Sequence, residues 1–239
     1  MSEKLQVRIA AAKVGKYATP ESGDTLEMVE RPHGGLSLAL ADGQRSGRAA
    51  KKISNIVVRK VVSLLAEGVR DGAAARAAHD YLFLHRGGQV SAELNIVSID
   101  LVSRTLVVSR NSHCPVLMIK NDHLSLLNEP SEPIGVYRNT KPSITELPLE
   151  PETYLIVFTD GILEAGRRTG NRLEMTTLAP ELLAATDGNP QALADALLKK
   201  AMTADKGRPC DDISVLVVAV TSGGESDKTR RMSVSFPIR

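Results

Sequence analysis

The chain has 239 residues, enough for one or two domains with a substantial core, and its 42% hydrophobic and 24% charged residues are typical of a globular protein. Aromatic residues make up only 3%, with no Trp, so the core must be aliphatic and stacking surfaces for single-stranded nucleic acid are not expected. The net charge of +2 is too small to predict binding to nucleic acid or to a membrane surface.

Strands are expected in the first part of the chain. Leu5, Val7 and Ile9 alternate with polar residues, which is the pattern of a half-buried strand. Two more strands are expected over residues 25–30 and 36–42, joined by a turn that contains Pro and Gly. The second of these is apolar enough to be a central strand.

Helical spacing follows these strands. Apolar residues between 50 and 64 predict a helix that ends near Gly68, and an Ala-rich helix is expected over residues 71–84. Short strands then resume in the manner of an antiparallel meander. The expected strands are 92–101, 105–110, 116–120, one directly after Asn121-Asp122, 144–147 and 154–159.

The last part of the chain predicts a further helix and a central strand. Asn189 as N-cap and Pro190 at the first helical position mark the start of the helix. The nearly continuous apolar run over residues 213–220 predicts the strand. Strands, two helices, strands, helices and a final strand favour the α+β class, a sandwich, over a doubly wound parallel fold.

One domain is expected over residues 1–221. Residues 221–229 (TSGGESDKT) have the composition of a linker. Beyond them, apolar residues recur at every second position: Met232, Val234, Phe236 and Ile238. Residues 222–239 are therefore expected to form a linker followed by a C-terminal tail or an added edge strand.

Cysteine content and hydropathy bear on the location of the protein. Two cysteines, Cys114 and Cys210, cannot form a disulfide framework. No apolar run approaches the ~18 residues of a spanning helix, and residues 1–16 lack the hydrophobic core of a signal peptide. We therefore expect a reduced, cytoplasmic protein without a membrane partner.

Acidic residues stand at strand ends, several of them beside glycine. Asp42 and Asp160 each close an apolar strand and precede a Gly, Asp24 follows Ser22-Gly23, and Asp211-Asp212 precedes the last strand. Each Asp-Gly pair taken alone is more often a simple turn. Jointly, such carboxylates are costly unless a cation compensates them, and Mg²⁺ or Mn²⁺ prefers oxygen ligands. The Gly43 carbonyl could supply another oxygen, because Gly permits close backbone approach.

An ordered set of motifs resembles the PPM superfamily of metal-dependent protein serine/threonine phosphatases, specifically its bacterial SpoIIE, RsbU and RsbX group. The set spans about residues 20–220, nearly the whole chain. The matching segments are 22–24 (SGD), 41–43 (ADG), 46–50 (SGRAA), 111–115 (NSHCP), 132–135 (EPIG), 159–165 (TDGILEA) and 210–215 (CDDISV).

The resemblance implies a β-sandwich of two antiparallel sheets flanked by helices, with two Mn²⁺ or Mg²⁺ ions bound at one end. Asp42 would bridge both ions, Asp160 and Asp211 would hold one of them, and Asp24 with the Gly43 carbonyl would serve the other, directly or through water. Asp42, Asp160 and Asp211 would thus be the catalytic residues. Asp212 is expected to hold a loop or cap backbone donors.

The implied activity is hydrolysis of phosphoserine and phosphothreonine by a water that the ions activate, with no covalent enzyme intermediate. The substrate would be a phosphorylated regulatory protein in a signalling pathway, such as an anti-sigma-factor antagonist. Two alternatives stay open. One is a catalytically weak module that binds phosphoproteins, and the other is a small-molecule phosphomonoesterase with the same metal site.

The sequence departs from the family pattern in three places. Gln44 stands where eukaryotic members have a His, so no general acid is assigned. Glu27 stands where RsbU-like members have a second Asp. Ser112 stands where members usually have a Gly. Arg45 lies closest in sequence to the expected ions and is a candidate for phosphate binding, although a solvated helix face explains the basic residues nearby equally well. His113 is expected to be a structural, hydrogen-bonded turn residue, not a zinc ligand.

Overall fold

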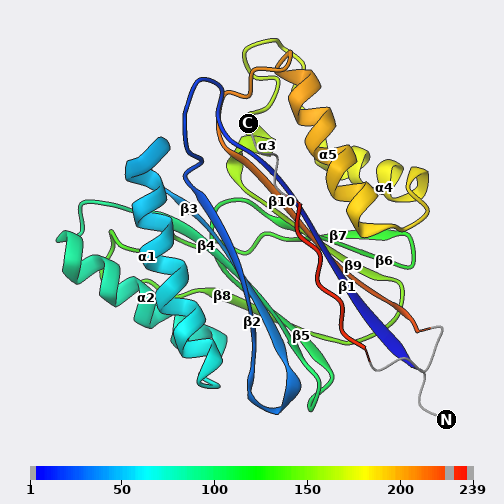
Figure 1. Ribbon diagram of the computed structural model, residues 1–239, viewed down its shortest axis with the longest axis horizontal. Coiled ribbons are helices and arrows are strands. Elements are labelled where there is room, and N and C mark those ends of the chain that lie inside the picture. The colour runs from blue at the N-terminus through cyan, green and yellow to red at the C-terminus, as the bar shows by residue number, and fades with distance from the viewer. Residues whose placement is uncertain (1–3, 224–228, 236–239) are drawn as a thin grey trace.

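The computed structural model describes residues 4–223 and 229–235 of the chain (Figure 1). Within these residues ten strands form two five-stranded antiparallel sheets, and helices cover the outer face of each sheet. Figure 1 shows α1 and α2 on one side of the sandwich and α4 and α5 on the other. The expected α+β sandwich of two antiparallel sheets is confirmed.

Each sheet is named here by one of its interior strands, β10 or β3. The β10 sheet has the order β1 (Leu5–Val14), β10 (Ile213–Ser222), β9 (Thr153–Phe158), β6 (Val116–Lys120) and β7 (His123–Leu127). The β3 sheet has the order β2 (Asp24–Glu30), β3 (Leu36–Gly43), β4 (Ala92–Asp100), β5 (Thr105–Asn111) and β8 (Ser143–Pro148).

Two pairs of helices cover these sheets. Long helices α1 (Gly47–Ala66) and α2 (Asp71–Arg86) pack on the β3 sheet, and α4 (Met175–Ala185) and α5 (Pro190–Ala204) pack on the β10 sheet. The short α3 (Asp160–Glu164) follows β9, and a 3-10 turn, η1 (Pro32–Gly34), lies between β2 and β3.

The alternation of side chains along β10 explains why its sequence is continuously apolar. Leu216 and Val218 face the core between the sheets, whereas Val215 and Val217 face α4 and α5. Both faces of the strand are therefore buried, so period-two alternation of polar and apolar residues is absent. Loss of water contact on both faces makes this strand a large contributor to stability.

The expected elements match the observed ones closely, except that the short helix α3 and helix α4 had no predicted range. Asn189 caps α5 as predicted, and its side chain accepts hydrogen bonds from the backbone N–H groups of Gln191 and Ala192. Helix α4 had no predicted range, because Pro180 lies inside it and removes a helical donor. Met175 and Leu183, packed on the β10 sheet, hold this helix by tertiary contacts that its own propensity does not reveal.

Residues 229–235 form neither helix nor strand, so the edge-strand alternative is not seen there. Met232 and Val234 are exposed, and Arg230 pairs with Glu30 at 3.0 Å. The other two residues of that alternation, Phe236 and Ile238, lie outside the described residues, as does most of the expected linker. Among the helices that are described, none has both the length and the apolar character needed to cross a membrane.

Candidate active site

Three carboxylates form a row across the β3 sheet. Asp24 at the start of β2 is the register partner of Asp42 on β3, and Asp42 is in turn the register partner of Glu93 on β4. Directly paired residues project from the same face of an antiparallel sheet. This face is the inner one, since Leu26 and Leu40, two residues away on the same strands, lie in the core between the sheets.

The β10 sheet brings two more carboxylates to the same end of the sandwich. Asp160 directly follows Thr159 at the end of β9, and Asp211 precedes the neighbouring strand β10. Both interact electrostatically with Asp42, as does Asp24. The structure therefore brings together the four aspartates that the sequence singled out, from four separate segments.

Two oxygen atoms of this group are buried without a hydrogen bond. The Asp24 carboxylate accepts hydrogen bonds on Oδ2 from Thr159 Oγ1 at 3.0 Å and from Ser214 Oγ at 2.5 Å. Its Oδ1 and the Oδ1 of Asp160 have no partner among the described residues. Buried acceptors without a donor are expensive, and a cation is the partner that would satisfy both.

The carboxylates also alter one another's ionisation. Burial, followed by repulsion from Asp24 and Asp160, raises the pKa of Asp42 to about 10. Burial and the charge of Asp211 raise the pKa of Asp160 to about 6. Without a cation Asp42 therefore retains its proton at neutral pH, and a divalent ion would favour the release of that proton. The all-oxygen donor set fits a hard cation such as Mg²⁺ or Mn²⁺.

Gly43 and Gly161 follow two of these aspartates for a packing reason. A Cβ atom on Gly43 would lie 2.1 Å from the carbonyl oxygen of Ala50 in α1, and one on Gly161 would lie 2.1 Å from the carbonyl oxygen of Asp212. No side chain fits at either position. From the sequence we expected Gly43 to let its carbonyl oxygen come close to a metal ion. The structure shows that Gly43 allows β3 to pack closely against the backbone of α1.

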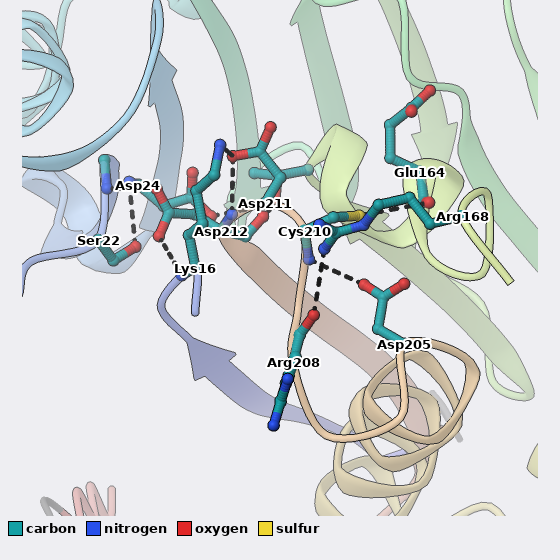
Figure 2. A network of polar contacts seen from close by, with 12 residues as sticks. Lys16, Ser22, Asp24, Glu164, Arg168, Asp205, Arg208, Cys210, Asp211 and Asp212 are labelled. Carbon is teal, nitrogen blue, oxygen red and sulfur yellow. Dashed lines mark hydrogen bonds and ion pairs between the residues drawn. The ribbon is translucent and has the colours of Figure 1, made fainter. Parts of the chain in front are cut away.

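Asp212 holds a loop, as expected. Its Oδ1 accepts the backbone N–H of Lys16 and its Oδ2 accepts that of Gly23, both at 2.8 Å (Figure 2). Ser22 also accepts the N–H of Asp24 through Oγ, at 3.3 Å. Asp212 therefore ties the loop before β2 to the segment that carries Asp211.

Two lysines hold the backbone of Asp24, a role that the sequence did not indicate. Lys13 Nζ and Lys51 Nζ each donate to the Asp24 carbonyl oxygen at 2.6 Å, and Lys51 also donates to Thr25 Oγ1 at 2.9 Å. Lys51, one of the basic residues that follow Arg45 in the sequence, is thus used structurally. Arg45 is exposed in the turn before α1, with a left-handed φ of 77°.

Glu93 is the functional candidate that sequence reasoning missed. It accepts a hydrogen bond from Ser112 Oγ at 2.6 Å and contacts the Nδ1 atom of His113, which raises the pKa of that imidazole. Ser112, at the position where the resemblance leads one to expect a Gly, therefore holds Glu93 in place. The one signal available was an acidic residue at the start of an apolar strand.

The surroundings of His113 disfavour a zinc site, and Glu27 lies away from the aspartates. Glu93, His113 and Cys114 offer atoms within 4.8 Å of one another. Burial raises the pKa of Cys114, however, and this disfavours the thiolate that zinc requires. Glu27 is exposed, three residues along β2 from Asp24, so it does not join the aspartates.

Comparison with known proteins identifies the relatives of this chain. The family described as Stage II sporulation protein E (SpoIIE) matches residues 32–221. Stage II sporulation protein E of Priestia megaterium is 24% identical over 208 residues, which make up 87% of this chain and 34% of that protein. The chain thus spans about a third of the length of that curated relative.

Solved structures show the same fold. The PP2C phosphatase domain of SpoIIE from Bacillus subtilis, solved with a fragment of its regulatory domain, has a TM-score of 0.81 and 21% identity, covering 94% of this chain and 66% of that one. The catalytic domain of the serine/threonine protein phosphatase PstP has a TM-score of 0.70 and 16% identity, covering 91% of this chain and 100% of that one. Because the family match extends over most of its length, the chain belongs to the SpoIIE family and has the PPM phosphatase fold.

Proposed function

We propose that this protein is a metal-dependent protein serine/threonine phosphatase. The observation that carries the proposal is the convergence of Asp24, Asp42, Asp160 and Asp211 at one end of the sandwich, with two buried carboxylate oxygens left unpaired. Family membership supports the same activity. A protein that only bound phosphoproteins would gain nothing from carboxylates that repel one another and the ligand.

The site would hold two Mn²⁺ or Mg²⁺ ions. Asp42 would bridge them, Asp160 and Asp211 would complete the site of one ion, and Asp24 Oδ1 with the Gly43 carbonyl would serve the other. The unpaired atoms Asp24 Oδ1 and Asp160 Oδ1 belong to the two sides of this arrangement. PstP, which shares the fold, was solved with two manganese ions.

When bound, such ions would offset the charge of the phosphate and activate a water for in-line attack on phosphorus. The protein's own residues prepare the site. Thr159 and Ser214 fix the Asp24 carboxylate by hydrogen bonds to Oδ2, which leaves Oδ1 free to bind a cation. The exposed guanidinium of Arg45, three residues after Asp42 in the sequence, would bind the phosphate oxygens of the substrate.

A phosphorylated regulatory protein is the proposed substrate, and an anti-sigma-factor antagonist is the leading candidate. The support is resemblance to the SpoIIE and RsbU group, so the substrate is an analogy drawn from the family. A small phosphomonoester is the second candidate. Comparable kcat/KM for para-nitrophenyl phosphate and for a phosphoserine protein would favour that alternative.

The deciding experiment measures phosphate release from a phosphoserine peptide in EDTA, Mg²⁺ or Mn²⁺. We expect release only with metal, and its loss in Asp42→Asn and Asp160→Asn. Asp122→Asn is a matched control, because Asp122 lies in a tight turn with φ of 61°, which Asn tolerates. Absence of release with every metal, from protein shown to be folded, would contradict the proposal and leave the binding-module alternative.

A further inference from the structure

A hollow of about 560 Å³ opens on the surface beside the candidate site. Three segments meet around it: the loop after β1, the turn after α3 and the loop between α5 and β10. Figure 2 shows part of this region, next to Asp211. The lining residues are Tyr17, Arg168, Thr169, Asp205, Lys206 and Arg208.

The accessible charge of the hollow is positive. Arg168, Lys206 and Arg208 are exposed, whereas Asp205 is only 6% exposed. Both oxygens of Asp205 are also occupied, since they accept the backbone N–H groups of Gly166 and Cys210 at 2.9 Å. Among the described residues no carboxylate forms an ion pair with any of the three cations. The charges of Lys206 and Arg208 are available to a ligand, and that of Arg168 is offset in part by the buried Asp205.

Local contacts hold two of the cations in place. The Arg208 guanidinium lies over the Tyr17 ring, 5.2 Å from its centroid, and Arg168 Nη2 donates to the Arg208 carbonyl oxygen at 3.3 Å. The N–H of Tyr17 donates to the Pro209 carbonyl at 3.0 Å. A side chain that is already positioned loses less entropy when it binds a ligand, so this arrangement favours recognition of an anion.

The hollow is linked directly to the candidate metal ligands. Tyr17 follows Lys16, whose Nζ lies 3.8 Å from Asp211 Oδ1 and whose N–H binds Asp212. Arg208 precedes Asp211 by three residues, a separation of at most about 11 Å between their Cα atoms. An extended peptide covers that distance in about three residues.

We propose that this basic hollow binds an acidic side chain of the phosphoprotein substrate, located about three residues from the phosphorylated residue. The inference rests on the proposed function, since it names a feature of the substrate of that same site. The hollow carries the charge that such a side chain requires, and it lies within the reach that such a spacing allows.

The test compares two synthetic peptides that differ only in charge. In one, Glu stands three residues to either side of a phosphoserine, and in the other Gln replaces both Glu residues. We expect a KM about tenfold lower for the Glu peptide, and loss of this preference in the double variant Arg168→Gln and Arg208→Gln. Arg59→Gln, an exposed substitution on α1, is the matched control and should keep the preference. Equal KM values for the two peptides in the native protein would overturn the inference.

A binding measurement separates this inference from the proposed function. Fluorescence anisotropy of a labelled, unphosphorylated Glu peptide at low salt needs neither metal nor turnover. Binding that weakens about tenfold in the double variant, but not in Arg59→Gln, supports the hollow even if no phosphate is released. Hydrolysis without preference for the Glu peptide, together with unchanged binding in the double variant, overturns the hollow and leaves the phosphatase proposal standing.

Discussion

Asp24 and Asp42 stand directly opposite each other across β2 and β3, although 17 residues of chain lie between them and both side chains are acidic. Like charges that face each other in a sheet are destabilising. Glu93 continues the row on β4. A protein keeps such an arrangement only if something compensates it, and the compensation proposed here is a pair of divalent cations.

Removal of the central charge is therefore expected to stabilise the metal-free protein. Asp42→Asn in EDTA replaces a carboxylate whose neighbours repel it with a neutral side chain of the same shape. A gain of about 2 kcal/mol corresponds to a rise in Tm of roughly 4–8 °C for a chain of this size. Differential scanning calorimetry measures the shift, and the control variant Asp122→Asn should have the same Tm as the native protein. A fall in Tm for Asp42→Asn would show that the carboxylate is satisfied without metal.

The same residue predicts how stability depends on pH. The pKa of Asp42 is raised to about 10 by burial and neighbouring carboxylates, whereas an unfolded Asp titrates near 3.9. The folded chain therefore holds this proton more tightly, so the stability it contributes is complete below about pH 4 and is lost as pH rises through about 10. Urea unfolding in EDTA between pH 5 and 8 should show native protein losing stability relative to Asp42→Asn, by at most about 1.4 kcal/mol per pH unit. Parallel curves for the two proteins would contradict this account.

The fold and most of the site could be predicted because their signals are local. Asp42 and Asp160 each end an apolar run and precede a Gly, and Asn189-Pro190 marks a helix start whatever the rest of the chain does. The ordered motifs then place these residues together by resemblance. Helix α4 lacked a local signal because Pro180 opposes it, and its packing on the β10 sheet decides the outcome.

What escaped prediction depends on partners distant in sequence. Glu93 becomes informative only once β4 is paired with β3, because a lone Glu at the start of a strand is ordinarily a surface residue. Lys13 and Lys51 contact Asp24 from two different elements, and no spacing in the sequence predicts these contacts. Each of these contacts requires the register of the sheets and the position of α1.

Gly43 is expected to be intolerant of even the smallest side chain. The Cβ atom that Gly43→Ala introduces would lie 2.1 Å from the Ala50 carbonyl oxygen, so α1 or β3 must shift and the aspartates must move with them. We expect a loss of about 2–4 kcal/mol in the free energy of unfolding, together with weaker metal binding by calorimetric titration. Gly15→Ala is the matched control, because its new Cβ has no neighbour closer than 3.6 Å. Equal stability of the two variants would contradict the packing role of Gly43.

Arg45 should affect substrate binding more than turnover. Its exposed side chain contributes to no described ion pair, so Arg45→Ala is expected to leave Tm within about 1 °C of the native value. Loss of a charge-assisted bond of about 1.5–3 kcal/mol would raise KM for a phosphoserine peptide roughly 10- to 100-fold. Arg59→Ala on the exposed face of α1 is the control. An unchanged KM in Arg45→Ala removes Arg45 from the phosphate site.

Asp212→Asn should act in the opposite direction to Asp42→Asn, although the chemical change is the same. The two Asp212 oxygens accept the N–H groups of Lys16 and Gly23, and an amide can accept only through its single oxygen. The amide NH₂ would then face a backbone N–H in a buried setting, at a cost of about 1–3 kcal/mol. In EDTA the Tm should fall by several degrees, where that of Asp42→Asn rises. Opposite signs for two Asp→Asn changes at the same end of the sandwich would distinguish the carboxylate that supports the loop from the one that needs a cation. A rise in both would contradict the role of Asp212, and a fall in both would contradict that of Asp42.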